Sequence, residues 1–216
     1  MKKLLFLFLL MMAGILLSSN MGFKATMTFA PGGSNAWWVS IPYYYFPQDV
    51  DSSGTVNSAD VCADATNLAG IFAWDSATGT PIGYTCGGIE DPFDIQKGRS
   101  YQFVGDGSAT ITWISVGSHD PTYQHSYPAG GSNAWWVSIP YHWNPVDIDS
   151  SGTKNSPDLC NEVTNLAGVF AWDPATGTPI GYTCGGIEDP FDINVFNGYQ
   201  FVGDGSATIT WTPSHY

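Results

Sequence analysis

Apolar residues alternate with polar or small residues over much of the first half of the chain, which is the period-two pattern of β-strands. Turn-forming stretches at 76–81, 87–92 and 105–108 separate the alternating segments. The pattern predicts about six short strands within roughly 95 residues. The alternating positions are Phe23, Ala25, Met27 and Phe29, then Trp37, Val39 and Ile41, then Ile82, Tyr84 and Cys86, then Tyr101 and Phe103, then Ala109, Ile111 and Trp113.

One helix is expected among these strands. Val61, Ala65 and Leu68 stand at i, i+4 and i+7, which is the spacing of a helix face. Further along, Ser156 followed by Pro157 is typical of a helix N-cap and first helical residue. The same i, i+4, i+7 spacing recurs there at Leu159, Val163 and Leu166.

The chain repeats itself. The stretch "GGSNAWWVSIPY" occurs at 32–43 and again at 130–141, an offset of 98 positions that holds without a gap to "VGDGSATITW" at 104–113 and 202–211. Self-similarity of this kind indicates tandem units. We predict a leader at 1–20, unit 1 at 21–115 and unit 2 at 116–216. The predicted fold class is mainly β, with two tandem β-sandwich-like domains that each hold one short helix and one intradomain disulfide.

The cysteines follow the repeat. Four cysteines allow three disulfide connectivities, but only Cys62–Cys86 with Cys160–Cys184 lets both units make the same bond. Closing such a loop contributes about 3 kcal/mol in the chain-entropy model. Disulfides are typical of an oxidising, extracellular compartment.

Composition and charge narrow the class of protein. With 44% apolar and 15% aromatic residues, the 216-residue chain can bury a substantial core. Its 19 acidic residues face 6 basic ones, for a formal charge of −13. Such a surface repels phosphate backbones, so nucleic acid is not expected as a partner.

The first twenty residues, "MKKLLFLFLLMMAGILLSSN", are built like a secretory signal. Two lysines precede an apolar run from Leu4 to Leu17, and small polar residues follow it. The run is short for a membrane span, which needs roughly 20 apolar residues. We therefore predict a secreted protein, extracellular or at the cell surface. An uncleaved leader, acting as the protein's membrane anchor, is the alternative.

Two twelve-residue stretches are rich in oxygen ligands. "DVDSSGTVNSAD" at 49–60 and "DIDSSGTKNSPD" at 147–158 place oxygens at positions 1, 3, 5, 9 and 12 and glycine at position 6. This is the pattern of EF-hand calcium loops, which lead into a helix. The stretches resemble the loops of dockerin modules, although a separation of 98 residues among strands does not imply cellulosome docking. The predicted ligands are Asp49, Asp51, Ser53, the Thr55 carbonyl, Asn57 and Asp60, and Asp147, Asp149, Ser151, the Thr153 carbonyl, Asn155 and Asp158.

A solvated Asp/Ser/Gly turn is the alternative interpretation of these stretches. Three gathered carboxylates, however, repel one another by several kcal/mol at an effective dielectric near 20 unless a cation lies between them. We therefore predict Ca²⁺ in a structural role, bound weakly in a range of about 10⁻⁴ to 10⁻³ M. Magnesium requires a stricter octahedron, and zinc is disfavoured because the cysteines are expected in disulfides.

Adjacent tryptophans recur in both units. Trp37 and Trp38 cannot face the same side of a strand, and the same holds for Trp135 and Trp136. One of each pair is expected in the core. The other is either exposed, where it could stack on a glycan, or covered by the helix or the neighbouring unit, and we favour the covered arrangement.

No enzyme is predicted. None of the histidines is repeated, and the "IEDPFD" stretch at 89–94, with Glu90, Asp91 and Asp94, fits a solvated turn better than paired catalytic acids. A site built once, at the joint between the units, is the remaining catalytic alternative. The histidines are His119, His125, His142 and His215.

The unit as a whole, with "WWVSIPY", "YTCGG" and a closing aromatic stretch, resembles a β-rich repeat of secreted and envelope proteins of bacteria and archaea, whose strand reads like W-x-S-L-P-Y. The resemblance implies an extracellular location and tandem use. We expect a calcium-stabilised structural or adhesive protein that associates with itself or with other envelope proteins. The segment "GFKATMTF" at 22–29 could build filaments by strand addition, and "PTYQHSY" at 121–127 would do the same job within the chain. A carbohydrate-binding module is the alternative.

Overall fold

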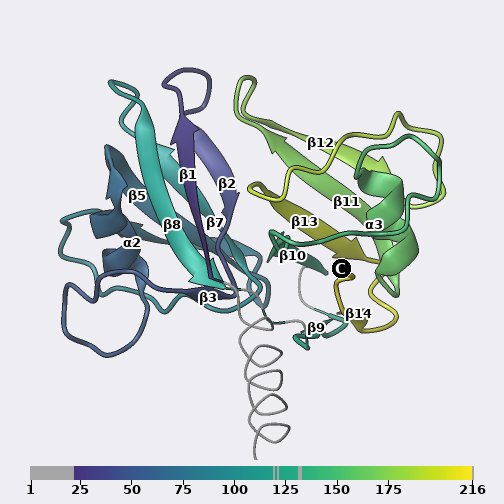
Figure 1. Ribbon diagram of the computed structural model, residues 1–216, viewed down its shortest axis with the longest axis horizontal. Helices are drawn as coiled ribbons and strands as arrows, with labels where there is room; N and C mark the ends of the chain where they lie inside the picture. The colour runs from purple at the N-terminus through teal and green to yellow at the C-terminus, as the bar shows by residue number, and fades with distance from the viewer. Residues whose placement is uncertain (1–21, 119, 121, 131–132, 216) are drawn as a thin grey trace, which may run out of the picture.

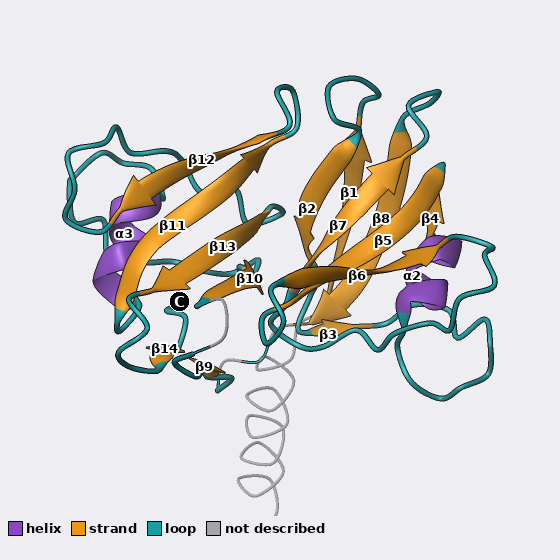
Figure 2. Ribbon diagram, turned by 180° about the vertical axis from the view of Figure 1, so that it is seen from behind, coloured by secondary structure: helices purple, strands orange, loops and turns teal. Residues whose placement is uncertain are grey.

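The computed structural model describes residues 22–118, 120, 122–130 and 133–215. The predicted leader and His119 lie outside the described residues. The described chain forms two β-rich units with one disulfide in each, which confirms the predicted fold class. Figure 1 shows the units side by side, unit 1 in purple to teal and unit 2 in green to yellow. The helix of each unit lies on the outer flank of the molecule in both views (Figures 1 and 2).

Unit 1 is a sandwich of two sheets. One sheet has the order β2-β7-β5-β6, and in the other β8 lies between β1 on one side and β3 and β4 on the other. All of these pairings are antiparallel. The elements are β1 (Phe23–Phe29), β2 (Ala36–Ser40), β3 (Tyr44–Tyr45), α2 (Ser58–Asp64), β4 (Ala65–Thr66), β5 (Leu68–Asp75), β6 (Thr80–Thr85), β7 (Ser100–Gly105) and β8 (Ile111–Ser118).

Unit 2 repeats this arrangement with a smaller second sheet. The order β10-β13-β11-β12 matches the four-stranded sheet of unit 1, and β9 pairs with β14 over three residues. The elements are β9 (His125–Tyr127), β10 (Ala134–Ser138), α3 (Ser156–Glu162), β11 (Leu166–Asp173), β12 (Thr178–Thr183), β13 (Gly198–Gly203) and β14 (Ile209–Trp211).

Aromatic side chains from facing sheets fill each core. Phe103 of β7 and Trp113 of β8 are fully buried, and their ring centroids lie 5.0 Å apart in an edge contact. Phe201 and Trp211 take the same places in unit 2, at 5.4 Å. These are inward positions of the predicted alternation, and burying each ring stabilises the fold by about 2–3 kcal/mol.

The predicted helix extent is wrong in both units. α2 ends at Asp64, Ala65 is already extended, and Leu68 begins strand β5. Asn67, with φ of 61°, turns the chain between the two strands, and Leu68 then pairs with Gly105. The helical spacing of the apolar residues arises because a short helix and a strand pack against one core. Unit 2 differs from the prediction in the same way, since α3 ends before Leu166.

The boundary between the units also differs from the prediction. β8 continues to Ser118, so the last strand of unit 1 runs past residue 115. Val116 and Gly117 pair with Lys24 and Phe23 of β1, which places these residues in unit 1. Among the described helices, none is long and apolar enough to cross a membrane.

Candidate metal centres and the joint between the units

The predicted carboxylates come together in both units. Asp49, Asp51 and Asp60 each offer a carboxylate oxygen within 4.8 Å of the other two, and so do Asp147, Asp149 and Asp158. The first two members of each triad are exposed and the third is buried. Each acidic triad could therefore hold a metal ion at the start of a helix.

Backbone N–H groups curl the loop around its first aspartate. Ser53 N donates to Asp49 Oδ1 at 3.2 Å and Gly54 N donates to Asp49 Oδ2 at 3.1 Å. Gly54 has a φ of 75°, the left-handed conformation that glycine adopts without strain. Hydrogen bonds from Ser53 lower the pKa of Asp51, and those from Ser151 lower the pKa of Asp149. Both aspartates are therefore ionised at neutral pH and present full charge to a cation.

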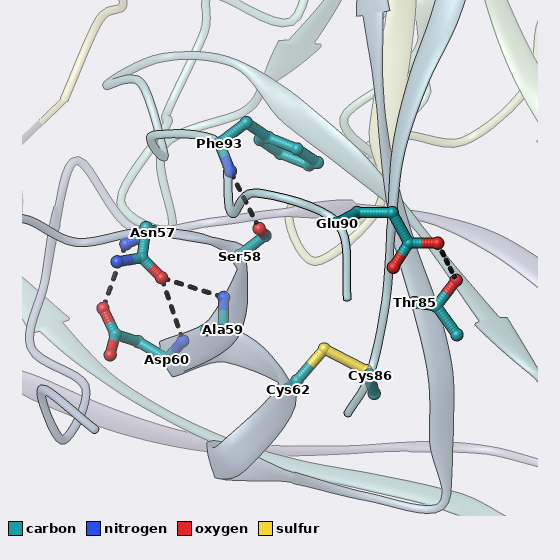
Figure 3. The surroundings of a disulfide bond; sticks show 9 residues. All are labelled: Asn57, Ser58, Ala59, Asp60, Cys62, Thr85, Cys86, Glu90 and Phe93. Carbon is teal, nitrogen blue, oxygen red and sulfur yellow. Dashed lines mark hydrogen bonds between the residues drawn. A yellow bond between two sulfur atoms is a disulfide. The ribbon is translucent and has the colours of Figure 1, made fainter. Parts of the chain in front are cut away.

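The last aspartate of each loop also caps the helix. Asp60 Oδ2 accepts from Asn57 N at 3.0 Å, and Asn57 Oδ1 accepts from the N–H groups of Ala59 and Asp60, which together form a capping box (Figure 3). Asp60 Oδ1 accepts from Val50 N at 2.9 Å. The buried carboxylate thus ties the start of the loop to the start of the helix.

This capping role corrects the predicted ligand at position 9. The Asn57 amide oxygen accepts helix N–H groups, and the amide nitrogen donates to Asp51 Oδ2 at 2.8 Å and to Ser53 Oγ at 3.1 Å. Asn155 does the same toward Asp149 in unit 2. Asn57 and Asn155 therefore turn N–H groups, not oxygens, toward the acidic triads, because a helix N-cap needs the oxygen.

The remaining predicted ligands lie beside the triad. Ser53 Oγ donates to the Thr55 carbonyl at 3.1 Å, and Ser151 to the Thr153 carbonyl at 3.2 Å. A further carboxylate, not predicted as part of the site, lies next to the loop but outside the triad: Thr55 Oγ1 donates to Asp94 Oδ1 at 3.4 Å, and Thr153 Oγ1 to Asp192 Oδ1 at 3.0 Å. The recurrence of "IEDPFD" at the repeat offset was the sequence signal that marked it.

The donor set fits a hard cation. The side chains around each triad offer carboxylate and hydroxyl oxygens, which are the ligands of Ca²⁺ and Mg²⁺. The thiols are engaged elsewhere: Cys62 of α2 is bonded to Cys86, and Cys160 to Cys184, as predicted. Each disulfide closes a separation of 24 residues and joins the capped helix to the end of a strand (Figure 3).

In each tryptophan pair one ring packs in the core and the other is covered, as expected. Trp37 contacts Phe29 and the core of unit 1, and Trp135 is buried in the core of unit 2. Trp38 and Trp136 stack on each other with ring centroids 3.9 Å apart, and each is 8% exposed. The cover is therefore the neighbouring unit. The exposed tryptophans on which the glycan alternative depended are not present in the structure.

A buried histidine lies at the same joint. Tyr43 of unit 1 contacts His125 Nε2 through its hydroxyl, and Tyr127 Oη lies 2.6 Å from His125 Nδ1. Because Tyr127 donates to the Gly98 carbonyl, it accepts from Nδ1–H, and Nε2 accepts from Tyr43. Burial lowers the pKa of His125 to about 3. The imidazole is thus neutral, and both of its nitrogens are hydrogen-bonded.

No family model, curated protein or solved structure matches the chain. The resemblances to dockerin loops and to the W-x-S-L-P-Y repeat remain predictions.

Proposed function

We propose that this is a secreted protein whose two units are each braced by Ca²⁺, and that it serves as a structural or adhesive protein outside the cell. The observation that carries the proposal is the acidic triad, built once in each unit with its oxygens within 4.8 Å. The formal charge of −13 favours binding of cations, and the two disulfides suit an oxidising environment.

Calcium, when bound, supplies positive charge among carboxylates that otherwise repel one another. Asp49 and Asp51 come from the loop and Asp60 from the buried helix start, so binding all three fixes the loop to the helix. An ion that binds only the folded unit stabilises it by mass action. At ten to a hundred times the dissociation constant, this amounts to about 1 to 3 kcal/mol per site.

Thermal unfolding tests this proposal. The melting temperature should rise in about 10 mM calcium relative to chelator, because extracellular sites of this kind bind near the millimolar range. Replacing Asp51→Asn and Asp149→Asn together should abolish the shift.

Asp106→Asn with Asp204→Asn is the matched control, since both are exposed turn aspartates outside the triads and the change of charge is the same. A wild-type melting temperature that does not change with calcium would contradict the proposed metal sites. An equally large shift of the melting temperature in magnesium would show that a metal ion stabilises the units but that the ion is not specifically calcium.

Assembly by strand addition is the second part of the proposal. β1 pairs with β8 of its own unit from Phe23 to Phe29, so it is not a free strand in the single chain. Among the described strands it pairs with β8 alone, and no described strand precedes it. β1 could therefore leave without unthreading and take the same place beside β8 of another chain, which would give an open series of subunits.

Locking β1 in its own unit tests the exchange. Thr26 and Ile114 are paired and exposed, so Thr26→Cys with Ile114→Cys should form a disulfide within the chain. Electron microscopy in calcium should show filaments for the wild type and for the control Thr26→Ser with Ile114→Ser, and single molecules for the locked protein. Filaments from the locked protein would exclude strand exchange, and wild-type protein that stays monomeric would exclude assembly.

Glycan binding is the second candidate function, now for a different surface. A cavity of about 350 Å³ in unit 1 is lined by the aromatic residues Trp74 and Phe93 together with Asp75, Asp94 and Arg99. Aromatic faces beside charged groups are typical of sugar sites. Glycan-array binding that Trp74→Ala abolishes would support it, and a silent array would exclude it.

A further inference from the structure

The two units meet through equivalent positions. Trp38 and Trp136, which are 98 positions apart, stack with an interplanar angle of 1°. β2 and β10 are edge strands of their own sheets, and each continues into a contact with the other unit through the bridges Val39–Asn197 and Val137–Arg99. Contacts that are reciprocal in this way are those of an isologous pair related by a two-fold axis.

The hydrogen bonds at the joint are reciprocal as well. Ser40 Oγ accepts from Ile139 N at 2.9 Å, and Ser138 Oγ accepts from Ile41 N at 2.9 Å. Each serine also donates to a carbonyl of the other unit, at residues 197 and 99 respectively. These hydrogen bonds of the two buried hydroxyls therefore all cross the joint.

A tyrosine from each unit reaches into the other. Tyr43 packs against Tyr123 of unit 2 at 5.0 Å between ring centroids. Its equivalent, Tyr141, packs against Phe23 of unit 1 at 4.5 Å and donates to the Ser40 carbonyl at 3.0 Å. The identical stretch "WWVSIPY" thus supplies the stack, the serine bonds and the exchanged tyrosine on both sides.

The pairing is asymmetric where β7 and β13 begin. Ser100 and Gly198 occupy equivalent positions at the starts of β7 and β13, and they face each other across the joint. A Cβ on Gly198 would lie 2.4 Å from both Cβ and Oγ of Ser100. Carbon atoms prefer separations of about 3.5–4.0 Å, so two serines cannot occupy this pair of positions without a shift of the units.

We propose that this pairing face, made by Trp38, Ser40, Tyr43 and Ser100 in unit 1 and by their equivalents in unit 2, is a recognition surface for another unit of the same kind. Ser100 opposite Gly198 makes the face of unit 1 accept unit 2 and reject a second unit 1. The face of unit 1 is thus matched to unit 2 and not to a second unit 1. The equivalents in unit 2 are Trp136, Ser138, Tyr141 and Gly198.

This pairing has a consequence for contacts between chains. In the single chain each face is covered by the other, so neither edge strand β2 nor β10 is open to strand addition. If unit 1 of one chain pairs with another chain through this face, it must contact unit 2 of that chain, which gives a head-to-tail contact.

A compensating pair of substitutions in the full-length chain tests the selection. Gly198→Ser places two serines opposite each other and should open the joint, so hydrogen exchange at the Ile41 and Ile139 amides should speed up on the order of 10- to 100-fold. Ser100→Gly with Gly198→Ser reverses the order of the pair and should restore slow exchange. Amides of β5 and β11, which lie within the sheets of each unit, are the internal reference.

The outcomes separate pairing from local strain. Serine already occupies the equivalent strand position in unit 1, so the strand itself accepts it. If the double variant exchanges as fast as Gly198→Ser, the damage lies within unit 2 and the proposal is wrong. It is also wrong if Gly198→Ser leaves the exchange rates unchanged. Calcium is held constant throughout, so neither outcome depends on the metal.

Discussion

The same corner of the core is filled differently in the two units. In unit 1, Trp113 Nε1 donates to Tyr45 Oη at 3.2 Å, and Tyr45 Oη donates to Asp64 Oδ2 at 2.8 Å. In unit 2 the equivalent residues are Trp211, Trp143 and Glu162, and each indole donates directly to one Glu162 oxygen at 2.9 Å.

The difference follows from what each side chain can do. A tyrosine hydroxyl both accepts and donates hydrogen bonds, so Tyr45 can accept from Trp113 and donate to the short side chain of Asp64. An indole only donates, so two indoles need two acceptor oxygens, and glutamate has the extra methylene that brings them within reach. The aromatic and acidic residues therefore change together between the units, and the buried hydrogen bonds are kept.

The largest expected effect concerns another position where the units differ, at which unit 1 has Met27 and unit 2 has His125. Burial lowers the pKa of His125 to about 3, below its ordinary value of about 6.5. The unfolded chain therefore binds this proton more tightly. The contribution of neutral His125 to the free energy of unfolding is fully present above about pH 6.5. As the pH falls toward 3, the free energy of unfolding decreases by about 4 kcal/mol.

Urea unfolding across this pH range measures the loss. His125→Met copies unit 1 and should flatten the pH dependence, whereas the acidic residues shared by both proteins should contribute equally. Identical pH slopes for the two proteins would show that His125 does not exchange its proton in this way.

The disulfides offer a comparison in which the units should agree. Each bond closes the same separation, 24 residues, beside a capped helix. Replacing Cys62 and Cys86 by serine should lower the free energy of unfolding by about 3 kcal/mol, and replacing Cys160 and Cys184 should do the same. Calorimetry that shows one unit much more affected than the other would contradict their equivalence.

A smaller effect is expected from exchanging the acids that accept hydrogen bonds from the buried aromatic residues, Asp64 in unit 1 and Glu162 in unit 2. Glu162→Asp is too short for both indoles and should cost about 2 kcal/mol, because a buried donor loses its acceptor. Asp64→Glu lengthens an acid that has a single hydrogen bond to make and should cost less than about 1 kcal/mol. If chemical denaturation shows the same loss of unfolding free energy for both variants, the length of the acidic side chain does not explain which acid accompanies which aromatic residues.

Much of the fold could be predicted because alternation and repetition are local or exact signals. The inward rings of Phe103 and Trp113 follow from period two, and the disulfides follow from the repeat. Leu68 was misplaced because a helix and a strand that pack on one core produce the same apolar spacing. Spacing alone does not show where a helix ends.

The sequence correctly predicted which carboxylates come together in the candidate metal centre, but it predicted the neutral ligands less well. The spacing brings Asp49, Asp51 and Asp60 together, but it does not show that Asn57 uses its oxygen to cap the helix. Period two shows that Trp37 and Trp38 face opposite sides of a strand. That Trp38 meets its own repeat is a property of tertiary packing, which no local pattern encodes.

Anomalous diffraction from crystals grown in calcium tests the central claim most directly. We expect one anomalous peak between Asp49, Asp51 and Asp60 and a second between Asp147, Asp149 and Asp158, each at about 2.3–2.6 Å from carboxylate oxygens. Aspartates surrounded by water alone, in crystals bathed in the ion, would contradict the account.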